Sequence, residues 1–417
     1  MRFKNRYICL DITKIMFIFG HPSRIHMIAV EKALDSIVHF TIPLKKFRMN
    51  LSSSSGHFLA ENVVSPINMP PFRQSAMDGY AVHLHHSNSY QLIGEVKAGD
   101  LSNPVLKPGE AIRIFTGAAV PDTANAVVIQ EKVVVNGRSI DLDGIVHEGA
   151  NIRPLGEQVK KGKTALEKGT KLTPAAIGFL ASLGITALVA YQKPSIAIVI
   201  TGNELIPPGT PLQYGQIYES NAPMLASALQ HLGFSDYREY KVEDDYENTC
   251  KLLQNVMAKH DAVLITGGIS VGDYDFVGKA LKALEVEEIF YKVKQKPGKP
   301  LFFGKKDKTT IFALPGNPAA ALNCFYVYVH TALQILSGNT NFELPTSEKK
   351  SVASFTKKGD RAQFLKAIIK GESVTILNGQ SSSMLQTFAL ANGLVFLPEE
   401  TKQINVGDMV KVITLPN

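Results

Sequence analysis

The residues best suited to binding or catalysis stand in a glycine-rich loop past the middle of the chain. A short apolar run, residues 262–265, is followed by Gly267 and Gly268 and then by two carboxylates, Asp273 and Asp275. Such a run is typical of a strand buried on both faces, and glycines let the backbone turn sharply and lie close to a ligand. The alternative is a plain tight turn in which Asp275 only caps the next helix.

Two further loops offer cationic and backbone groups. The sequence Lys-Pro-Gly-Lys-Pro holds Lys296 and Lys299 between prolines and a glycine. An ammonium group fixed in this way binds a phosphate or oxyanion better than a flexible one does; the alternative is a solvated run of surface lysines. Further on, Asn317 and Pro318 are predicted to start a helix whose positive end lies beside Pro315 and forms an anion site.

The chain after Lys193 alternates short apolar runs with helical segments, which is typical of a parallel sheet. One run, residues 195–200, ends in Thr-Gly-Asn-Glu, so Glu204 follows a strand just as the glycine-rich loop does. Ligands bind where the carboxyl ends of parallel strands meet. We therefore expect Glu204, the loop carboxylates, the two lysines and the helix start at Asn317 to converge at one edge of the sheet.

Carboxylates beside phosphate-binding groups suit Mg²⁺, which prefers one or two carboxylates together with water and substrate oxygens. Such a metal could polarise a phosphoryl group and neutralise a leaving group. The sequence contains no Walker-type Gly-x-x-x-x-Gly-Lys-Ser/Thr, which argues against nucleoside triphosphate handling of that kind.

Composition indicates a multidomain globular protein. At 417 residues the chain is too long for one ordinary core, and about two to four domains are expected. Most of the net charge of +7 lies in residues 1–26, so the remainder favours local anion sites over a surface that binds nucleic acid. Cys9, Cys250 and Cys324 lie far apart without zinc-type spacing, which favours a reduced, cytoplasmic compartment.

The first 26 residues look unlike the rest. Their apolar stretch is too short to span a membrane, and no cleavage site for a signal peptide follows it. We interpret them as a disordered or artefactual leader, with Met27 as the working start.

Several helices have clear start signals or apolar faces. Thr173 and Pro174 are predicted to begin one helix, and Asn221 is predicted to cap another. A helix from Met27 is expected to bury one face, which holds Val30, Ala33, Leu34, Ile37 and Val38.

The remaining segments read as β structure. Residues 90–147 alternate short apolar runs with glycine turns, and Thr116 ends one of the strands. Asp78, in a proline-rich segment before them, starts an Asp-Gly turn, and taken alone it more often only closes such a turn. Residues 345–417 read as a separate small β domain.

Six motifs together resemble the molybdopterin molybdenumtransferase family, which includes the bacterial enzyme, the E domain of its plant counterpart and the gephyrin E domain. The resemblance runs from Met27 to the C-terminus. Each motif is weak alone, but six in this order are highly specific: Pro-Pro-Phe-Arg-Gln-Ser-Ala-Met-Asp-Gly-Tyr-Ala (70–81), Phe-Thr-Gly-Ala-Ala-Val-Pro (115–121), Thr-Gly-Asn-Glu-Leu (201–205), Gly-Gly-Ile-Ser-Val-Gly-Asp-Tyr-Asp (267–275), Lys-Pro-Gly-Lys-Pro (296–300) and Leu-Pro-Gly-Asn-Pro (314–318).

The resemblance implies a multidomain α/β and β protein. After the leader, 1–26, the expected parts are an N-terminal domain I (27–72 and 148–193), an inserted β domain II (73–147), a central parallel-sheet α/β domain III of the molybdenum-cofactor-biosynthesis type (194–340) and a C-terminal β domain IV (345–417). It also implies a homodimer whose active site lies between the central domain of one subunit and the N-terminal part of the other.

The activity implied is insertion of molybdate into adenylated molybdopterin, with Mg²⁺-dependent release of AMP. The resemblance assigns catalytic roles to Asp78, Thr116, Glu204 and Asp275, with Glu204 and Asp275 as metal ligands. The substrate-binding residues it implies are Gly267, Gly268, Ser270, Asp273, Lys296, Lys299, Pro315, Asn317, Pro318, Arg361 and Ser382. Partners implied are the two substrates, a second copy of the chain, the adenylyltransferase of the same pathway and apo-molybdoenzymes, but no nucleic acid and no membrane.

Three positions depart from the family pattern. Asn203 stands where an aspartate is usual, Gln158 replaces another acid, and Ala320 replaces a serine.

Two other functions remain open. One is a nucleotide or pyrophosphate hydrolase on the same central fold, as in competence-damage-type proteins, and the other is a non-enzymatic scaffold, as in the anchoring role of gephyrin.

Overall fold

The computed structural model describes residues 27–269 and 276–416, and the chain divides into two compact units. One unit holds the residues up to Thr41, Ser195–Ala332 and the residues from Glu343 onward. The other holds Ile42–Pro194 and Leu333–Phe342. The proposed leader lies outside the described residues, so the start at Met27 stays a prediction.

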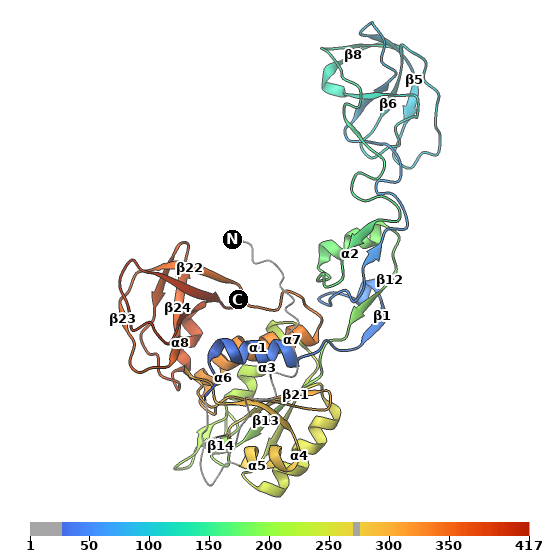
Figure 1. The fold of residues 1–417 in the computed structure, drawn as a ribbon. Helices are drawn as coiled ribbons and strands as arrows, with labels where there is room; N and C mark the ends of the chain where they lie inside the picture. The colour runs from blue at the N-terminus through green and yellow to red at the C-terminus, as the bar shows by residue number, and fades with distance from the viewer. Residues whose placement is uncertain (1–26, 270–275, 417) are drawn as a thin grey trace, which may run out of the picture. The chain divides into compact units, whose positions relative to one another are not determined.

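The first unit is built on a mixed sheet of order β16-β13-β17-β21-β20-β18 (Figure 1). The first four strands are parallel and the last two are antiparallel to their neighbours. β17 is buried along its whole length, as the apolar run predicted. The strands are β13 (Ile196–Thr201), β16 (Tyr237–Val242), β17 (Ala262–Thr266), β18 (Glu287–Tyr291), β20 (Phe302–Lys306) and β21 (Thr309–Leu314), with the short pair β14 (Leu205–Ile206) and β15 (Ile217–Tyr218) after β13.

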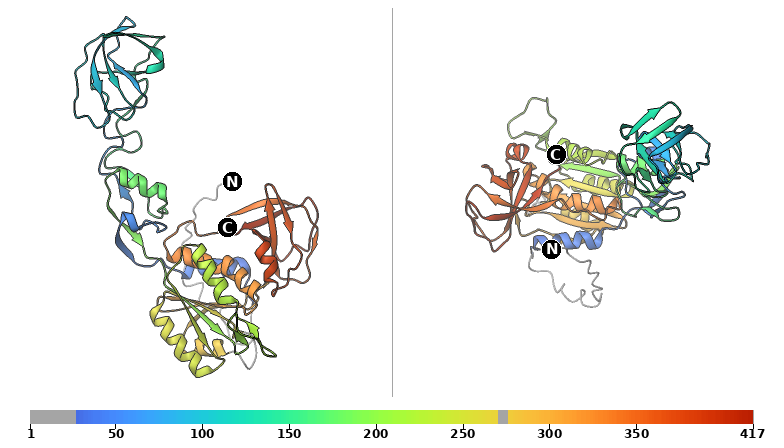
Figure 2. Two further views of the ribbon diagram at one scale, coloured as in Figure 1. Left: turned by 180° about the vertical axis from the view of Figure 1, so that it is seen from behind. Right: turned by 90° about the horizontal axis from the view of Figure 1, so that it is seen from above.

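Helices lie on both faces of this sheet (Figures 1 and 2). α4 and α5 pack on one face through Leu253, Val256, Val277 and Leu281. Because both faces are covered, the central strands read as continuous apolar runs rather than alternating ones. The helices are α1 (Val30–Phe40), α3 (Asn221–His231), α4 (Tyr246–Lys259), α5 (Phe276–Ala283), α6 (Pro318–Cys324), the π-helical turn η4 (Phe325–Val329) and α7 (His330–Leu336).

Two helix predictions need correction. α1 is present and buries Val30, Ala33 and Ile37, but Val38 is 40% exposed, so the predicted apolar face is too wide. Asn221 is the first residue of α3 rather than its cap, because the helix begins one residue earlier than predicted: Ser220 is the N-cap by position, and Glu219 Oε1 accepts the Ala222 N–H at 2.9 Å. The Asn221 amide Nδ2 donates to Gly316 O at 2.9 Å.

The helical run Pro318–Leu336 is long and apolar enough, by length and composition, to cross a membrane. However, 83% of it is buried inside the protein, as in the core helix of a globular domain.

The C-terminal part of the first unit is a closed sheet. β24 pairs with both β25 and β26, and the order β24-β25-β22-β28-β26 returns to β24, so the ring has no free edge. The ring strands are β22 (Thr346–Ser351), β24 (Ala362–Lys370), β25 (Ser373–Ile376), β26 (Gly393–Leu397) and β28 (Met409–Thr414). The short strand β19 (Gln295–Lys296) pairs with β24, and β23 (Phe355–Thr356) pairs with β27 (Gln403–Ile404). One helix, α8 (Leu385–Leu390), belongs to this part.

The second unit holds a sheet of order β7-β4-β6-β5-β9-β8 and a smaller set of paired strands with one helix. The helix α2 (Pro174–Ser182) begins as predicted, because Thr173 Oγ1 accepts the Ala176 N–H and Pro174 is the first helical residue. The sheet strands are β4 (Gly79–Val82), β5 (Ser89–Val96), β6 (Glu110–Ile114), β7 (Ala126–Ile129), β8 (Val133–Asn136) and β9 (Ser139–Leu142); the other strands are β1 (Lys46–Asn50), β2 (Val63–Val64), β3 (Gln74–Ser75), β10 (Ile152–Arg153), β11 (Thr164–Leu166) and β12 (Ala187–Tyr191), and two short turns are η2 (Leu51–Ser53) and η3 (Gln130–Lys132).

The predicted fold class is confirmed: the chain combines a largely parallel α/β sheet with two β regions. The exact domain limits proposed from the sequence stay a prediction.

Candidate active site

Glycines bring the sheet-end loops of the first unit close together. A Cβ atom on Gly267 would lie 2.7 Å from Thr201 O, and one on Gly268 would lie 2.9 Å from Thr201 Oγ1. Both glycines have positive φ angles, 84° and 62°, that other residues rarely adopt. A Cβ on Gly316 would also lie 3.8 Å from Gly267 Cα. The loops after β13, β17 and β21 therefore meet at the carboxyl edge of the sheet.

Glu204 is exposed in the first of these loops, three residues after the buried Thr201. Its neighbour Asn203 is tied to Asp244 by two hydrogen bonds. Asn203 Oδ1 accepts the Asp244 N–H at 3.0 Å, and Asn203 N donates to Asp244 Oδ2 at 3.3 Å. Asn203 thus keeps a hydrogen-bonding role where the family usually has an aspartate, and it brings the Asp244 carboxylate to the Glu204 loop.

Asp244 was not among the predicted site residues. The signal was available, because Asp244 directly follows the strand segment 237–242 in the alternating strand–helix pattern. Its neighbour Asp245 is the N-cap of α4 and accepts the Asn248 N–H at 2.8 Å. An Asp-Asp pair at a strand end can therefore supply one carboxylate to a helix cap and leave the other for the sheet edge.

Two buried oxygen atoms at this edge, Thr266 Oγ1 and Asn221 Oδ1, have no hydrogen-bond partner among the described residues. Buried polar atoms are normally paired with protein or with water.

The described residues contain no group of three or more His, Cys, Asp or Glu side chains placed to hold a metal ion. Mg²⁺ does not need such a cage, since it keeps several waters and takes one or two carboxylates plus substrate oxygens. The exposed Glu204 carboxylate at the strand end fits this kind of site. Ser270, Asp273 and Asp275 lie outside the described residues.

The loop that carries Lys296 and Lys299 is hydrogen-bonded to the core. Gln295 is fully buried, and its Nε2 donates to Gly298 O at 2.9 Å, while its Oε1 accepts from the Tyr328 hydroxyl. Pro297 and Gly298 are buried, whereas both lysines are exposed. Two ammonium groups are therefore presented to solvent from a backbone that has little freedom to move.

The first turns of α6 connect this loop to the C-terminal β ring. Gly298 packs so closely on α6 that a Cβ atom there would lie 2.5 Å from Cys324 Sγ and 3.6 Å from Ala320 O. At the start of α6, Asn317 Nδ2 donates to Ser382 Oγ at 3.0 Å. Arg361 Nη1 donates to Gln295 O at 3.2 Å.

The two remaining residues near this start are prolines. Pro315 is buried directly after β21, and Pro318 occupies the first position of α6, as predicted. Asn317 is the N-cap by position, but its side chain bonds Ser382 and not the helix. Pro318 has no N–H, and the Ala320 and Ala321 N–H groups donate to Asn317 O at 3.0 and 2.9 Å. The start of α6 therefore offers a ligand the positive end of the helix dipole rather than a set of free N–H groups.

Asp78 and Thr116 lie together in the second unit. Asp78 Oδ1 accepts the Thr116 hydroxyl at 2.6 Å and the Thr116 N–H at 2.7 Å. These two bonds, and to a smaller degree the Arg113 guanidinium, lower the pKa of Asp78, so the exposed carboxylate stays ionised. Arg113 itself lies between the Tyr80 and Phe115 rings and donates to Gly79 O at 3.3 Å.

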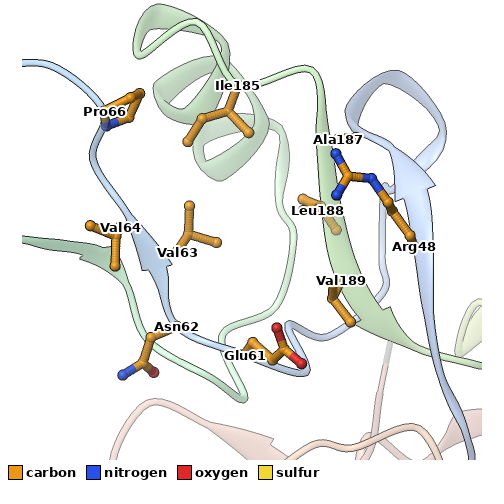
Figure 3. A pocket seen from close by; sticks show the side chains of 10 residues that line it. All are labelled: Arg48, Glu61, Asn62, Val63, Val64, Pro66, Ile185, Ala187, Leu188 and Val189. Atoms are coloured by element: carbon orange, nitrogen blue, oxygen red, sulfur yellow. The ribbon is translucent and has the colours of Figure 1, made fainter. Parts of the chain in front are cut away.

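Two cavities lie apart from the predicted site residues. One, of about 320 Å³, is in the second unit and is lined by Val63, Ile185 and Leu188 with Arg48 and Glu61 at its rim (Figure 3). The other, of about 410 Å³, is in the first unit beside the β13 and β16 strand ends and includes Pro207, Glu219 and Lys241. Neither is lined by a residue that the sequence analysis assigned to the site.

The comparisons with known proteins cover nearly the whole chain. Residues 28–184 match the MoeA N-terminal region (domains I and II), residues 197–335 match a probable molybdopterin-binding domain, and residues 350–415 match the MoeA C-terminal region (domain IV). Among curated proteins, the molybdopterin molybdenumtransferase of Haemophilus influenzae is 32% identical, and the alignment covers 93% of this chain and 98% of that protein. The protein of the same name from Staphylococcus epidermidis is 30% identical, with 93% and 95% covered.

A crystal structure of the molybdopterin biosynthesis MoeA protein from Pyrococcus horikoshii OT3 has a similar fold. Its TM-score is 0.80 at 27% identity, and the match covers 93% of this chain and all of that chain. The six motifs and the gathered sheet-end loops agree with these matches. This chain belongs to the molybdopterin molybdenumtransferase (MoeA) family.

Proposed function

We propose that this protein inserts molybdenum from molybdate into adenylated molybdopterin and releases AMP, the last step of molybdenum cofactor synthesis. The curated relatives bear the name of this activity. The observation that carries the proposal is the gathering of three sheet-end loops, the pinned lysine loop and the Ser382 segment around the start of α6.

The reaction requires two polyanions, molybdate and a nucleotide-linked phosphate, to lie side by side. Lys296, Lys299 and the positive end of the helix dipole at the start of α6 offset their repulsion with fixed positive charge. Because Gln295 and Tyr328 hold the lysine loop, little of this charge has to be reorganised when the substrates bind. Arg361 and Ser382 add a guanidinium and a hydroxyl on the side of the C-terminal ring.

Glu204, together with Asp275, would hold Mg²⁺, and Asp244 adds a further carboxylate to the same loop. When bound, the ion supplies positive charge to the phosphate oxygens as AMP leaves. The support for this assignment is the exposed Glu204 carboxylate at a strand end, in a loop that Asn203 ties to Asp244.

We infer that the protein works as a homodimer in which Asp78 and Thr116 of one protomer complete the site of the other. The support is that this pair is exposed and ionised, and that it belongs to a unit that contains none of the other predicted site residues. A fixed carboxylate at that position can orient a substrate group or accept a proton from it.

We propose a cytoplasmic location, because the widely spaced cysteines of the sequence suit a reduced compartment. The adenylyltransferase that supplies adenylated molybdopterin and the apo-molybdoenzymes that accept the cofactor are the partners that the chemistry requires.

Reconstitution tests the proposed function. Purified protein, adenylated molybdopterin, molybdate and Mg²⁺ are incubated, and both AMP release and activation of an apo-molybdoenzyme are measured, with a chelator as the control for the metal. We expect both signals, and both should disappear with the chelator. AMP release without activation would favour the hydrolase, and binding without either signal would favour the scaffold.

A further inference from the structure

A buried ammonium group lies in the C-terminal ring, outside the set of residues assigned to the site. Lys366 is on β24, and only 3% of it is exposed. Burial of an ammonium is costly unless its donors are satisfied, and burial lowers the pKa of Lys366. A lysine retained at such a position therefore needs a compensating role.

Lys366 uses its three donors on one short segment of backbone. Its Nζ donates to Gly379 O at 2.8 Å, to Ser381 O at 3.1 Å and to Met384 O at 3.1 Å. An ammonium group has three N–H donors, so these contacts satisfy it completely. They also fix the path of residues 379–384, which we call the serine segment.

The backbone of Lys366 is tied to the same segment by Gln380. Gln380 Oε1 accepts the Lys366 N–H at 2.9 Å, and Gln380 Nε2 donates to Lys366 O at 2.9 Å. Both the side chain and the backbone of Lys366 therefore hold the serine segment in place.

The serine segment reaches the proposed site through Ser382. Carbonyl groups on both sides of Ser382, those of Ser381 and Met384, are held by Lys366. Ser382 Oγ in turn accepts from Asn317 Nδ2 at 3.0 Å, at the start of α6.

We propose that Lys366 is a positioning residue that holds Ser382 where it contacts the bound oxyanion. This inference rests on the proposed function, because Ser382 is taken to be an oxyanion contact. Lys366 itself does not touch the substrate; it acts through the backbone of residues 379–384.

The test uses Lys366→Met, which keeps the length of the side chain and removes the ammonium. Lys357→Met is the matched control, since Lys357 is also buried in the C-terminal ring and donates to backbone carbonyls, those of Pro398 and Glu399. Ser382→Ala and the two double variants with Ser382→Ala complete the set.

The first measurement is hydrogen exchange of the full-length protein without substrates. We expect Lys366→Met to speed exchange across residues 379–384 about tenfold or more, with no such change in Lys357→Met. Unchanged exchange in Lys366→Met overturns the positioning role. Because this measurement does not depend on activity, it decides the inference even if the protein fails to transfer molybdenum.

The second measurement is the molybdate concentration that gives half-maximal transfer. We expect Lys366→Met and Ser382→Ala each to raise it about tenfold, and the double variant to be no worse than about twofold beyond either one. Lys357→Met and Ser382→Ala should instead combine independently. If Lys366→Met and Ser382→Ala also combine independently, Lys366 does not act through Ser382 and the inference is overturned.

Discussion

Gly298 is the residue in the lysine loop where an added methyl group should destabilise the protein most. Its φ angle is +84°, and a Cβ atom there would lie 2.5 Å from Cys324 Sγ. The left-handed conformation costs an L-residue about 1–2 kcal/mol, and overpacking a buried site costs about 1–3 kcal/mol. Gly298→Ala should therefore lower the free energy of unfolding by about 2–5 kcal/mol.

A second substitution separates the two costs. Cys324→Ala removes the sulfur atom that the new methyl group meets, but it cannot relieve the backbone conformation. On its own, Cys324→Ala should be destabilising, because it removes buried atoms and the contact with Gln295 Nε2 at 3.5 Å. In the Gly298→Ala background it should instead be stabilising, by about 1–3 kcal/mol, the overpacking cost.

Urea unfolding of the four proteins measures these differences, and the molybdate dependence of transfer reports on Lys296 and Lys299 in the same samples. We expect Gly298→Ala to need more molybdate, and the double variant to recover part of that loss. A Gly298→Ala protein as stable as the original, or a double variant no more stable than Gly298→Ala, would refute the account of how the loop is held.

The other predictions concern the Asp78 and Thr116 pair. Thr116→Val removes the hydroxyl donor and should raise the pKa of Asp78 towards its ordinary value, as measured by NMR titration of the carboxyl carbon. Since the pKa of Asp78 is lower in the folded protein, the stabilisation from this pair is present above the unfolded pKa and is lost as pH falls through the folded pKa. Thr116→Val should therefore make the free energy of unfolding less sensitive to acid. An unchanged titration of Asp78 in Thr116→Val would disprove the role of the hydroxyl. Mixing Asp78→Asn with Glu204→Gln protomers should restore about a quarter of the original activity, because about half of the dimers are mixed and each has one intact site. No recovery in verified mixed dimers would show that both residues act within one protomer.

Much of the fold follows from local patterns. The buried strand β17 and the start of α2 at Thr173 were predictable, because an apolar run and a Thr-Pro pair act through their immediate neighbours. The convergence of Glu204 with the glycine-rich loop also follows from the sheet, since parallel strands place their carboxyl ends together.

Tertiary hydrogen bonds account for what the sequence pattern did not predict. Asn221 is a good helix cap by type, but Glu219 accepts the Ala222 N–H instead, and the Asn221 Nδ2 group donates to Gly316 O, far away in the chain. Asp244 gains its place through Asn203, a partner from another loop.

Buried lysines are the hardest to predict. Lys366 stands in the strand segment 362–370 like any outward-facing strand residue, and only the fold of residues 379–384 over it reveals that it is enclosed. Burial of a charged residue depends on what covers it, which a local pattern does not contain.

Substitution of Glu204 tests most directly whether the carboxyl edge of the sheet is the site of molybdenum transfer. Glu204→Gln and the control Glu343→Gln, another exposed glutamate of the same unit, are compared with the original protein in the complete reconstitution. We expect Glu204→Gln to lose AMP release and enzyme activation by about 100-fold or more with its fold intact, while Glu343→Gln retains both. Undiminished AMP release and activation in Glu204→Gln would contradict a role for Glu204 in the reaction.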